Sequence, residues 1–101
     1  MLVELDIFSG QPNPVWELGE QDSERLVCAV NKLVAMAHAR SEIDGLGYRG
    51  FLFNIGNVQH RSYRNRIMTA THMLADPERN IELFLCERLP HRLDRLRSAI
   101  L

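Results

Sequence analysis

The sequence predicts an α+β domain in which a small, mostly antiparallel sheet packs against one main helix and two C-terminal helices. Three observations predict this fold class. The chain opens with alternating apolar and polar residues, a long amphipathic segment follows the first turn, and several strand-like segments separate it from a helical C-terminal part. The length of 101 residues fits one domain, residues 1–101, because domains most often have roughly 100–150 residues.

The first elements are expected to be two strands joined by a rigid turn. Apolar residues at every second position predict a strand over residues 2–8. A glycine and two prolines then make residues 9–14 typical of a turn, because proline fixes its backbone angle and glycine permits unusual ones. Residues 15–18 are extended and are expected to return as a second short strand.

The main helix is predicted over residues 20–40. Acidic residues occupy its first turns, where the helix dipole favours negative charge, and Gly19 serves as a weak N-cap. Apolar residues at helical spacing form one face, which consists of Leu26, Val27, Val30, Leu33, Val34 and Ala37.

The middle of the chain is expected to return to the sheet. Residues 51–55 alternate as a strand does, and Gly56 and Asn57 begin a turn. Residues 58–65 are expected to form either an edge strand or a polar loop, and residues 66–74 another strand.

The C-terminal part reads as two helices. Asp76 as N-cap, followed by Pro77 at the first helical position, predicts a helix start, and Pro90 predicts its end. The short terminal helix that follows has an apolar side formed by Leu93, Leu96 and Ile100.

Charge is divided unevenly along the chain. Residues 1–47 hold eight acids and three bases (−5), residues 48–101 hold nine bases and five acids (+4), and the sum is the net charge of −1. Such a chain can present an acidic face and a basic face to different partners. The alternative, that both are solvated surface, stays open.

Localisation in the cytoplasm is expected. The sequence contains no run of about 18 apolar residues that would span a membrane, and its N-terminus lacks the basic region of a secretion signal. Cys28 and Cys86 lie far apart in helix-like stretches, which favours buried thiols in a reducing compartment.

No catalytic or metal-binding motif is recognisable. The four histidines do not share helical spacing with one another or with a cysteine, so no metal site is predicted. A phosphate-binding loop is missing from the sequence as well. Apolar neighbours make Cys28 and Cys86 unsuited as nucleophiles. A small enzyme that uses Cys86 or a histidine nevertheless remains one alternative for the function of this chain.

The basic segment around Arg61, Tyr63, Arg64 and Arg66 is the best candidate for binding nucleic acid, since arginine binds phosphate and tyrosine stacks on bases. The sequence pI of about 6.4 is well below that of a typical nucleic-acid-binding domain. A solvated edge or a protein partner is therefore favoured over nucleic acid.

Two further stretches are candidates for recognition. Residues 8–16 contain the rigid turn, and Trp16, just past it, is either a core residue or an exposed anchor. Residues 45–51 place Tyr48 and Arg49, both common at interfaces, between glycines that allow close backbone approach.

Together with the helix start at 76–82, these stretches resemble the TglI-like proteins, the small partner proteins of multinuclear non-haem iron oxidases in 3-thiaglutamate biosynthesis. The likeness lies in Ser-Gly-x-Pro-Asn-Pro-x-Trp at 9–16, in Gly-Leu-Gly-Tyr-Arg-Gly-Phe at 45–51 and in the acidic-Pro helix start. In that pathway a cysteine is added to the C-terminus of a ribosomally made carrier peptide, and a barrel-type iron enzyme with its partner removes the cysteine β-carbon.

The resemblance implies that this chain is an accessory subunit that forms a heterodimer with the barrel subunit and holds the carrier, or leader, peptide. It implies no cofactor in this chain, because the iron ligands reside in the barrel. The alternative is a stand-alone protein- or peptide-binding module unrelated to iron chemistry. A peptide can bind by adding a strand to a sheet edge, with residues 2–8 or 58–65 as the candidate edges.

The sequence assigns no catalytic and no metal-binding residue. The residues expected to contact a partner or peptide are Ser9, Gly10, Gln11, Pro12, Asn13, Pro14, Trp16, Tyr48, Arg49, Arg61, Tyr63, Arg64 and Arg66.

Overall fold

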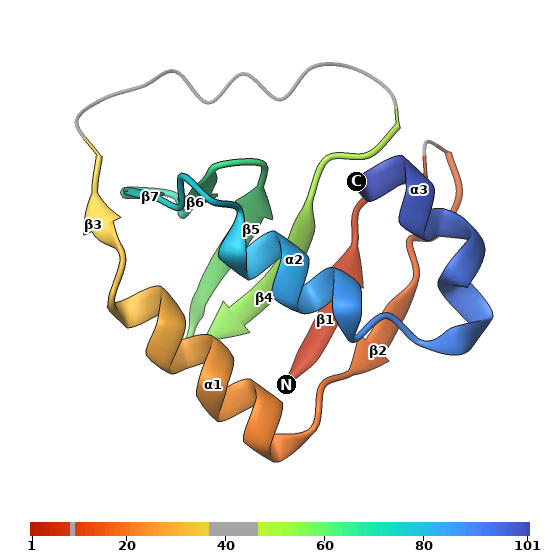
Figure 1. Ribbon diagram of the computed structural model, residues 1–101, viewed down its shortest axis with the longest axis horizontal. Coiled ribbons are helices and arrows are strands. Elements are labelled where there is room, and N and C mark those ends of the chain that lie inside the picture. The colour runs from red at the N-terminus through yellow and green to blue at the C-terminus, as the bar shows by residue number, and fades with distance from the viewer. Residues whose placement is uncertain (9, 37–46) are drawn as a thin grey trace.

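Seven strands form one antiparallel sheet in the order β2–β1–β4–β5–β6–β7–β3 (Figure 1). The computed structural model describes residues 1–8, 10–36 and 47–101. The strands are β1 (Leu2–Leu5), β2 (Val15–Glu17), β3 (Val34–Ala35), β4 (Phe51–Ile55), β5 (Val58–Tyr63), β6 (Arg66–Met68) and β7 (Met73–Ala75).

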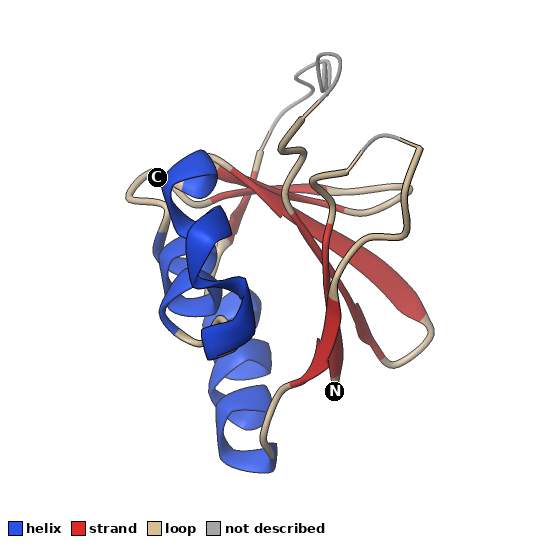
Figure 2. Cartoon of the chain, turned by 90° about the vertical axis from the view of Figure 1, so that its right-hand side faces the viewer, coloured by secondary structure: helices blue, strands red, loops and turns tan. Residues whose placement is uncertain are grey.

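The helices are α1 (Glu20–Asn31), α2 (Asn80–Glu87) and α3 (Arg97–Ile100), with a 3₁₀ helix η1 (His91–Leu96) before α3. All of them lie on one side of the sheet (Figure 2). This confirms the predicted α+β fold, with one main helix and two joined C-terminal pieces. No helix among the described residues is long and apolar enough to cross a membrane.

The core lies between the helices and the inner face of the sheet. Alternation along each strand turns one set of side chains inward, as Val3, Leu5 and Phe51 illustrate, and all three are fully buried. Leu26 of α1 and Leu85 of α2 cover this set from the helix side and are also fully buried. The opposite face of the sheet, which we call the open face, carries no helix among the described residues.

Helix α1 is shorter than predicted. It ends at Asn31, and Val34 and Ala35 pair with β7 instead of continuing the helix to residue 40. The apolar run from residue 33 is compatible with the period of a helix and with that of a strand. Pairing with the distant strand β7 makes it a strand. Residues 37–40 of the predicted helix lie outside the described residues.

Cys28 was expected to be buried, and this is wrong. It lies on the outer side of α1 and is exposed, whereas Cys86 on α2 is buried as predicted. The difference follows from the orientation of α1, which buries Leu26 and Val30 and turns Cys28, midway between them, to solvent.

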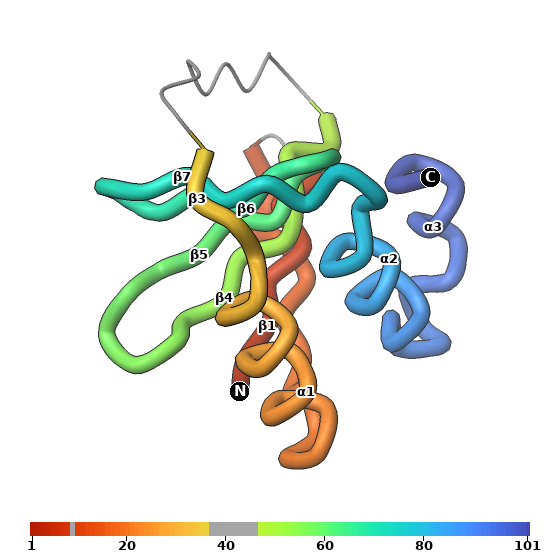
Figure 3. The backbone as a smooth tube through the Cα atoms, turned by 60° about the vertical axis from the view of Figure 1, so that its left-hand side comes forward, coloured from red at the N-terminus to blue at the C-terminus, as the bar shows by residue number. Residues whose placement is uncertain are grey.

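Two predictions for the middle of the chain also need correction. Residues 58–65 form neither an edge strand nor a loop, because β5 lies inside the sheet between β4 and β6. Residues 66–74 form not one strand but a hairpin of β6 and β7, closed by hydrogen bonds among Thr69, Thr71 and His72. In Figure 3 this hairpin and the β4–β5 turn project on the same side, away from α2.

Helix α2 begins four residues after the predicted N-cap. Its N-cap residue is Arg79, in the left-handed region at φ 58°, and its first helical residue is Asn80. The buried Asp76 carboxylate still accepts hydrogen bonds from the amides of Asn80 and Ile81, at 3.0 and 2.8 Å. Asp76 therefore satisfies the helix start across an intervening turn rather than as its adjacent cap.

Candidate functional site

The candidate site is on the open face, where strand register aligns Glu4, Leu52 and Arg61 in one row. Glu4 on β1 is paired with Leu52 on β4, and Leu52 is paired with Arg61 on β5. Because all three point away from Val3, Leu5 and the other inward residues, they share the open face. We call them the charged row. It continues to Val15 on β2 and Met68 on β6.

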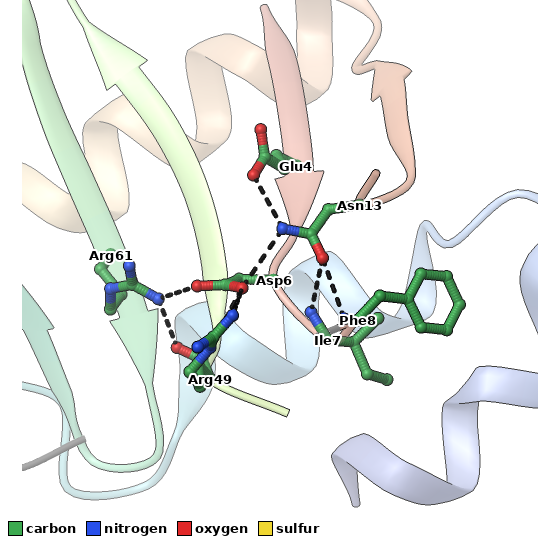
Figure 4. Close-up of polar contacts among 7 residues, drawn as sticks. All are labelled: Glu4, Asp6, Ile7, Phe8, Asn13, Arg49 and Arg61. Carbon is green, nitrogen blue, oxygen red and sulfur yellow. Dashed lines mark hydrogen bonds and ion pairs between the residues drawn. The ribbon is translucent and has the colours of Figure 1, made fainter. Parts of the chain in front are cut away.

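Asp6 lies beside the row and binds two arginines (Figure 4). Nη1 of Arg61 donates to Oδ2 of Asp6 at 2.6 Å, and Nη2 and Nε of Arg49 donate to Oδ1 at 2.8 and 3.2 Å. Nη1 of Arg61 also donates to the main-chain oxygen of Arg49 at 2.8 Å. The Asp6 side chain is 8% exposed, whereas those of Arg49 and Arg61 are 32% and 25% exposed.

The ion pairs keep Asp6 ionised. Burial raises the pKa of the Asp6 carboxyl, but the hydrogen bonds and charges of Arg61 and Arg49 outweigh burial and hold this pKa below its usual value. Two guanidinium groups share one carboxylate, so the cluster of Asp6, Arg49 and Arg61 has a net charge of +1. Its two arginines remain partly accessible to a ligand.

Asn13 joins the rigid turn to this cluster. Its Nδ2 donates to Glu4 Oε2 at 3.1 Å and to Asp6 Oδ1 at 3.2 Å. Its Oδ1 accepts hydrogen bonds from the amides of Ile7 and Phe8 at 3.1 and 2.9 Å. All four atoms that it contacts belong to the first eight residues, so Asn13 holds the turn against the end of β1.

Two adjoining hollows lie along the charged row and share Leu52 and Gln59. The first, which we call the Arg61 hollow, has a volume of about 550 Å³ and is lined by Leu52, Asn57, Val58, Gln59, Arg61, Met68, Thr69, Ala70 and Thr71. The second, the Glu4 hollow, has a volume of about 290 Å³ and is lined by Leu2, Glu4, Val15, Leu52, Phe53, Asn54 and Gln59. Among the described residues, each hollow is lined by one charged side chain.

Tyr48 and Arg49 are anchored within the fold. Arg49 binds Asp6, and the hydroxyl of Tyr48 donates to Oε2 of Glu82, a fully buried carboxylate of α2. Burial, together with the hydrogen bond and the charge of Glu82, raises the pKa of Tyr48. Gly50 follows at φ 108°, where a Cβ atom would lie 2.5 Å from the main-chain oxygen of Ser62. This glycine therefore allows a close approach to the backbone of β5 within the chain, and the expected approach to a partner surface stays a prediction.

The basic segment divides into separate environments. Arg61 belongs to the Asp6 cluster, so it is not the solvated edge residue that the sequence favoured. Arg64 lies at the β5–β6 turn at φ 57°, with its guanidinium carbon 5.7 and 5.4 Å from the ring centroids of Tyr48 and Tyr63. Arg66 is half-buried, and its Nε donates to Asn65 at 3.4 Å. Only Arg61 of these residues lines a hollow on the open face.

Trp16 is part of the core, so the exposed-anchor alternative does not hold in this structure. It is 7% exposed, and its ring packs edge-on against Phe51 with the centroids 6.0 Å apart. Gly10, Gln11 and Pro12 in the turn are exposed. Pro14 is half-buried, and its main-chain oxygen accepts a hydrogen bond from the Leu5 amide at 2.9 Å. Ser9 lies outside the described residues.

Both candidate edges for strand addition are wrong. Strand β1 lies between β2 and β4, and β5 lies between β4 and β6, so neither has an unpaired side. The true edges are β2 and β3, which have three and two residues. Arg92 donates to the main-chain oxygen of Val15 on the β2 edge at 3.1 Å. Short, partly covered edges are poor templates for another strand.

The sequence did not single out Glu4, Asp6 and Leu52, although they carry the open-face site. The signal for Glu4 and Asp6 was the polar phase of the first strand, which is usually solvent-facing, and Leu52 occupies the outward phase of β4. Asp6 differs from that expectation because two arginines that come 43 and 55 residues later neutralise it. Elsewhere, burial raises the pKa of the Cys86 thiol. No group of three His, Cys, Asp or Glu side chains suited to a metal ion occurs in the described part of the chain.

Comparison of this chain with family models, with curated proteins and with solved structures finds no match.

Proposed function

We propose that this chain is an accessory subunit that binds an extended carrier peptide on the open face of its sheet and presents it to a barrel-type multinuclear iron oxidase. The observation that carries the peptide-binding part is the open face itself, with its two adjoining hollows and the charged row that lines them. A hollow sheet face with few charged groups, each held in place, suits recognition of a flexible peptide.

The oxidase part of the proposal depends on the resemblance to the TglI-like partner proteins. In that setting the barrel subunit supplies the iron and the chemistry of cysteine β-carbon excision in ribosomal peptide natural-product biosynthesis, and this chain supplies binding alone, with no cofactor of its own. We place the complex in the cytoplasm, which suits the exposed thiol of Cys28 and the buried thiol of Cys86.

The rigid turn has a defined place in this proposal. Asn13 fixes the turn to β1, and Gly10, Gln11 and Pro12 remain exposed next to the open face. A turn of low conformational entropy is a suitable contact for the oxidase, because little order has to be gained on binding. Trp16 contributes by supporting this turn from the core rather than by contacting the partner.

The test is reconstitution with a barrel-type iron oxidase and its carrier peptide. We expect a one-to-one complex in size-exclusion chromatography and conversion of the peptide only when both proteins are present. Peptide binding without an oxidase complex would instead support the stand-alone binding module. Turnover by the isolated chain would support a small enzyme that uses Cys86 or a histidine, and would contradict the proposal.

A further inference from the structure

We infer that the charged row selects peptide segments in which an acidic and a basic side chain flank an apolar one. The inference rests on the proposed function, because it names the kind of segment that the open face would take. The acidic side chain would bind Arg61, the basic side chain would bind Glu4, and the apolar side chain would cover Leu52.

The spacing of the row supports such a segment. Glu4, Leu52 and Arg61 are directly paired on three adjacent strands. Neighbouring strands are about 4.8 Å apart, so the two charged residues are separated by about 10 Å at the level of the backbone. An extended peptide advances about 3.3 Å per residue and turns every second side chain to the same face, so the side chains two residues before and two residues after a central one are about 13 Å apart at the backbone, close enough for the long side chains of Glu4 and Arg61 to reach them.

The charges of the two hollows are complementary to opposite ends of one ligand. The Arg61 hollow has a single positive side chain and the Glu4 hollow a single negative one, among the described residues. Leu52 lines both hollows and separates the two charges. A nucleic acid fits this arrangement poorly, because its phosphates would be repelled by Glu4. A peptide that carries both signs satisfies both hollows.

Both charged side chains are held in place before a ligand arrives. Arg61 uses Nη1 for Asp6 and for the main-chain oxygen of Arg49, while a guanidinium has five N–H donors in all. Glu4 accepts from Asn13 at one oxygen, and a carboxylate has about four acceptor positions. Asp6 and Asn13 are therefore positioning residues, which orient the charged row without contacting the peptide.

The test uses four acetylated and amidated heptapeptides built on Gly-Asp-Gly-Leu-Gly-Lys-Gly. The other three replace Asp by Asn, Lys by Gln, or both, so that charge changes and length does not. Each half-exposed ion pair is expected to contribute a two- to fivefold gain, so the doubly charged peptide should bind about tenfold tighter than the neutral one. Affinities are measured by titration of the full chain followed by NMR.

Variants assign each charge to its residue. Arg61→Gln should abolish the preference for Asp over Asn and keep the preference for Lys over Gln. Glu4→Gln should do the reverse. Arg61→Lys, which retains the charge, should keep both preferences. If Arg61→Gln does not fold, Glu4→Gln with the four peptides still decides the inference, because it should remove the preference for Lys over Gln and leave the preference for Asp over Asn. Glu24→Gln, at an exposed position of α1 on the helix layer, is the matched control and should change neither preference.

Equal binding of all four peptides to the wild type would overturn the inference. So would absence of binding, or an equal effect of Glu4→Gln and Arg61→Gln on every peptide. These outcomes are separable from failure of the proposed function. If the chain forms the oxidase complex but binds all four peptides equally, only the selectivity of the charged row is contradicted. If the chain selects peptides by charge but forms no oxidase complex, only the accessory-subunit role is contradicted.

Discussion

Nη1 of Arg61 lies 2.6 Å from Oδ2 of Asp6, although 55 residues separate the two in the chain. The same carboxylate binds Arg49, and Asn13 donates to its other oxygen, so four segments of the chain meet at one half-buried cluster (Figure 4). The cluster has two consequences. It couples the stability of the sheet to the ionisation of Asp6, and it fixes the direction in which Arg61 meets a ligand.

Asp6→Asn should destabilise the fold in a pH-dependent way. The pKa of Asp6 is lowered in the folded state, so its ionised form stabilises the protein above the unfolded-state pKa of about 4, and this contribution is lost as the pH falls through the lower folded pKa. At pH 7 we expect a loss of about 2 kcal/mol, less than for a fully buried pair because both arginines are partly exposed.

Urea denaturation of the wild type and Asp6→Asn at pH 7, 5 and 3 measures this effect. The difference in the free energy of unfolding should be largest at pH 7 and should shrink towards pH 3. A difference that stays constant with pH would mean that the ion pairs of Asp6 do not stabilise the fold.

Asn13→Ala should destabilise the chain by about 2–3 kcal/mol. The change leaves the amides of Ile7 and Phe8 without their acceptor and removes a donor from Glu4 and Asp6. Gln11→Ala, in the same turn but exposed, is the control and should stay within about 0.5 kcal/mol of the wild type. Similar unfolding midpoints in urea for the two variants would contradict the anchoring role of Asn13.

Gly50→Ala should cost at least about 3 kcal/mol, since the new Cβ would meet the Ser62 oxygen at 2.5 Å in a positive-φ conformation. Gly10→Ala provides the comparison. Gly10 also has a positive φ, 75°, but nothing lies within 4 Å of its added Cβ, so only about 1–2 kcal/mol of backbone strain is expected. Thermal unfolding followed by circular dichroism separates the two; equal losses would refute the close approach of β4 and β5 at Gly50.

Tyr48→Phe should destabilise the chain by about 1.5–3 kcal/mol, because it removes a hydrogen bond to the ionisable and fully buried side chain of Glu82. Arg79 and the amide of Arg64 remain as partners of that carboxylate and limit the loss. Tyr63→Phe, on the neighbouring ring, is the control, and a loss as large as that of Tyr48→Phe would show that removal of either hydroxyl, rather than the hydrogen bond to Glu82, accounts for the effect.

Trp16→Ala should cost about 3–5 kcal/mol, the range typical of a large aromatic side chain removed from a core. Chemical denaturation measures the loss. A folded variant of unchanged stability would contradict the core position of Trp16 and would support the alternative that it is an exposed anchor.

The strands were predictable where burial alone decides the pattern. Alternation located β1 and β4 because each has one face against the core, and the turn at 9–14 was evident from its prolines and glycine. Strand order was not predictable, because β5 has the composition of an exposed strand and is internal only through its pairing with β4 and β6. The end of α1 was missed for the same reason, since pairing with β7 overrides local periodicity.

The site was predictable only in part. Asn13, Arg49 and Arg61 were singled out from local composition, and the structure brings these three together around Asp6. Their common partner Asp6 was not, because a single acidic residue in a strand normally faces solvent. Ion pairs between residues that are 43 and 55 positions apart leave no local signal in one sequence.

Mapping the carrier peptide onto the chain by NMR tests the central claim most directly. We predict that addition of the peptide to the isotopically labelled chain shifts the amide signals of Leu52, Gln59 and Arg61, whereas Val27 and Cys28 on the outer side of α1 stay unchanged. Shifts confined to α1, or no shifts at a saturating peptide concentration, would contradict peptide binding on the open face.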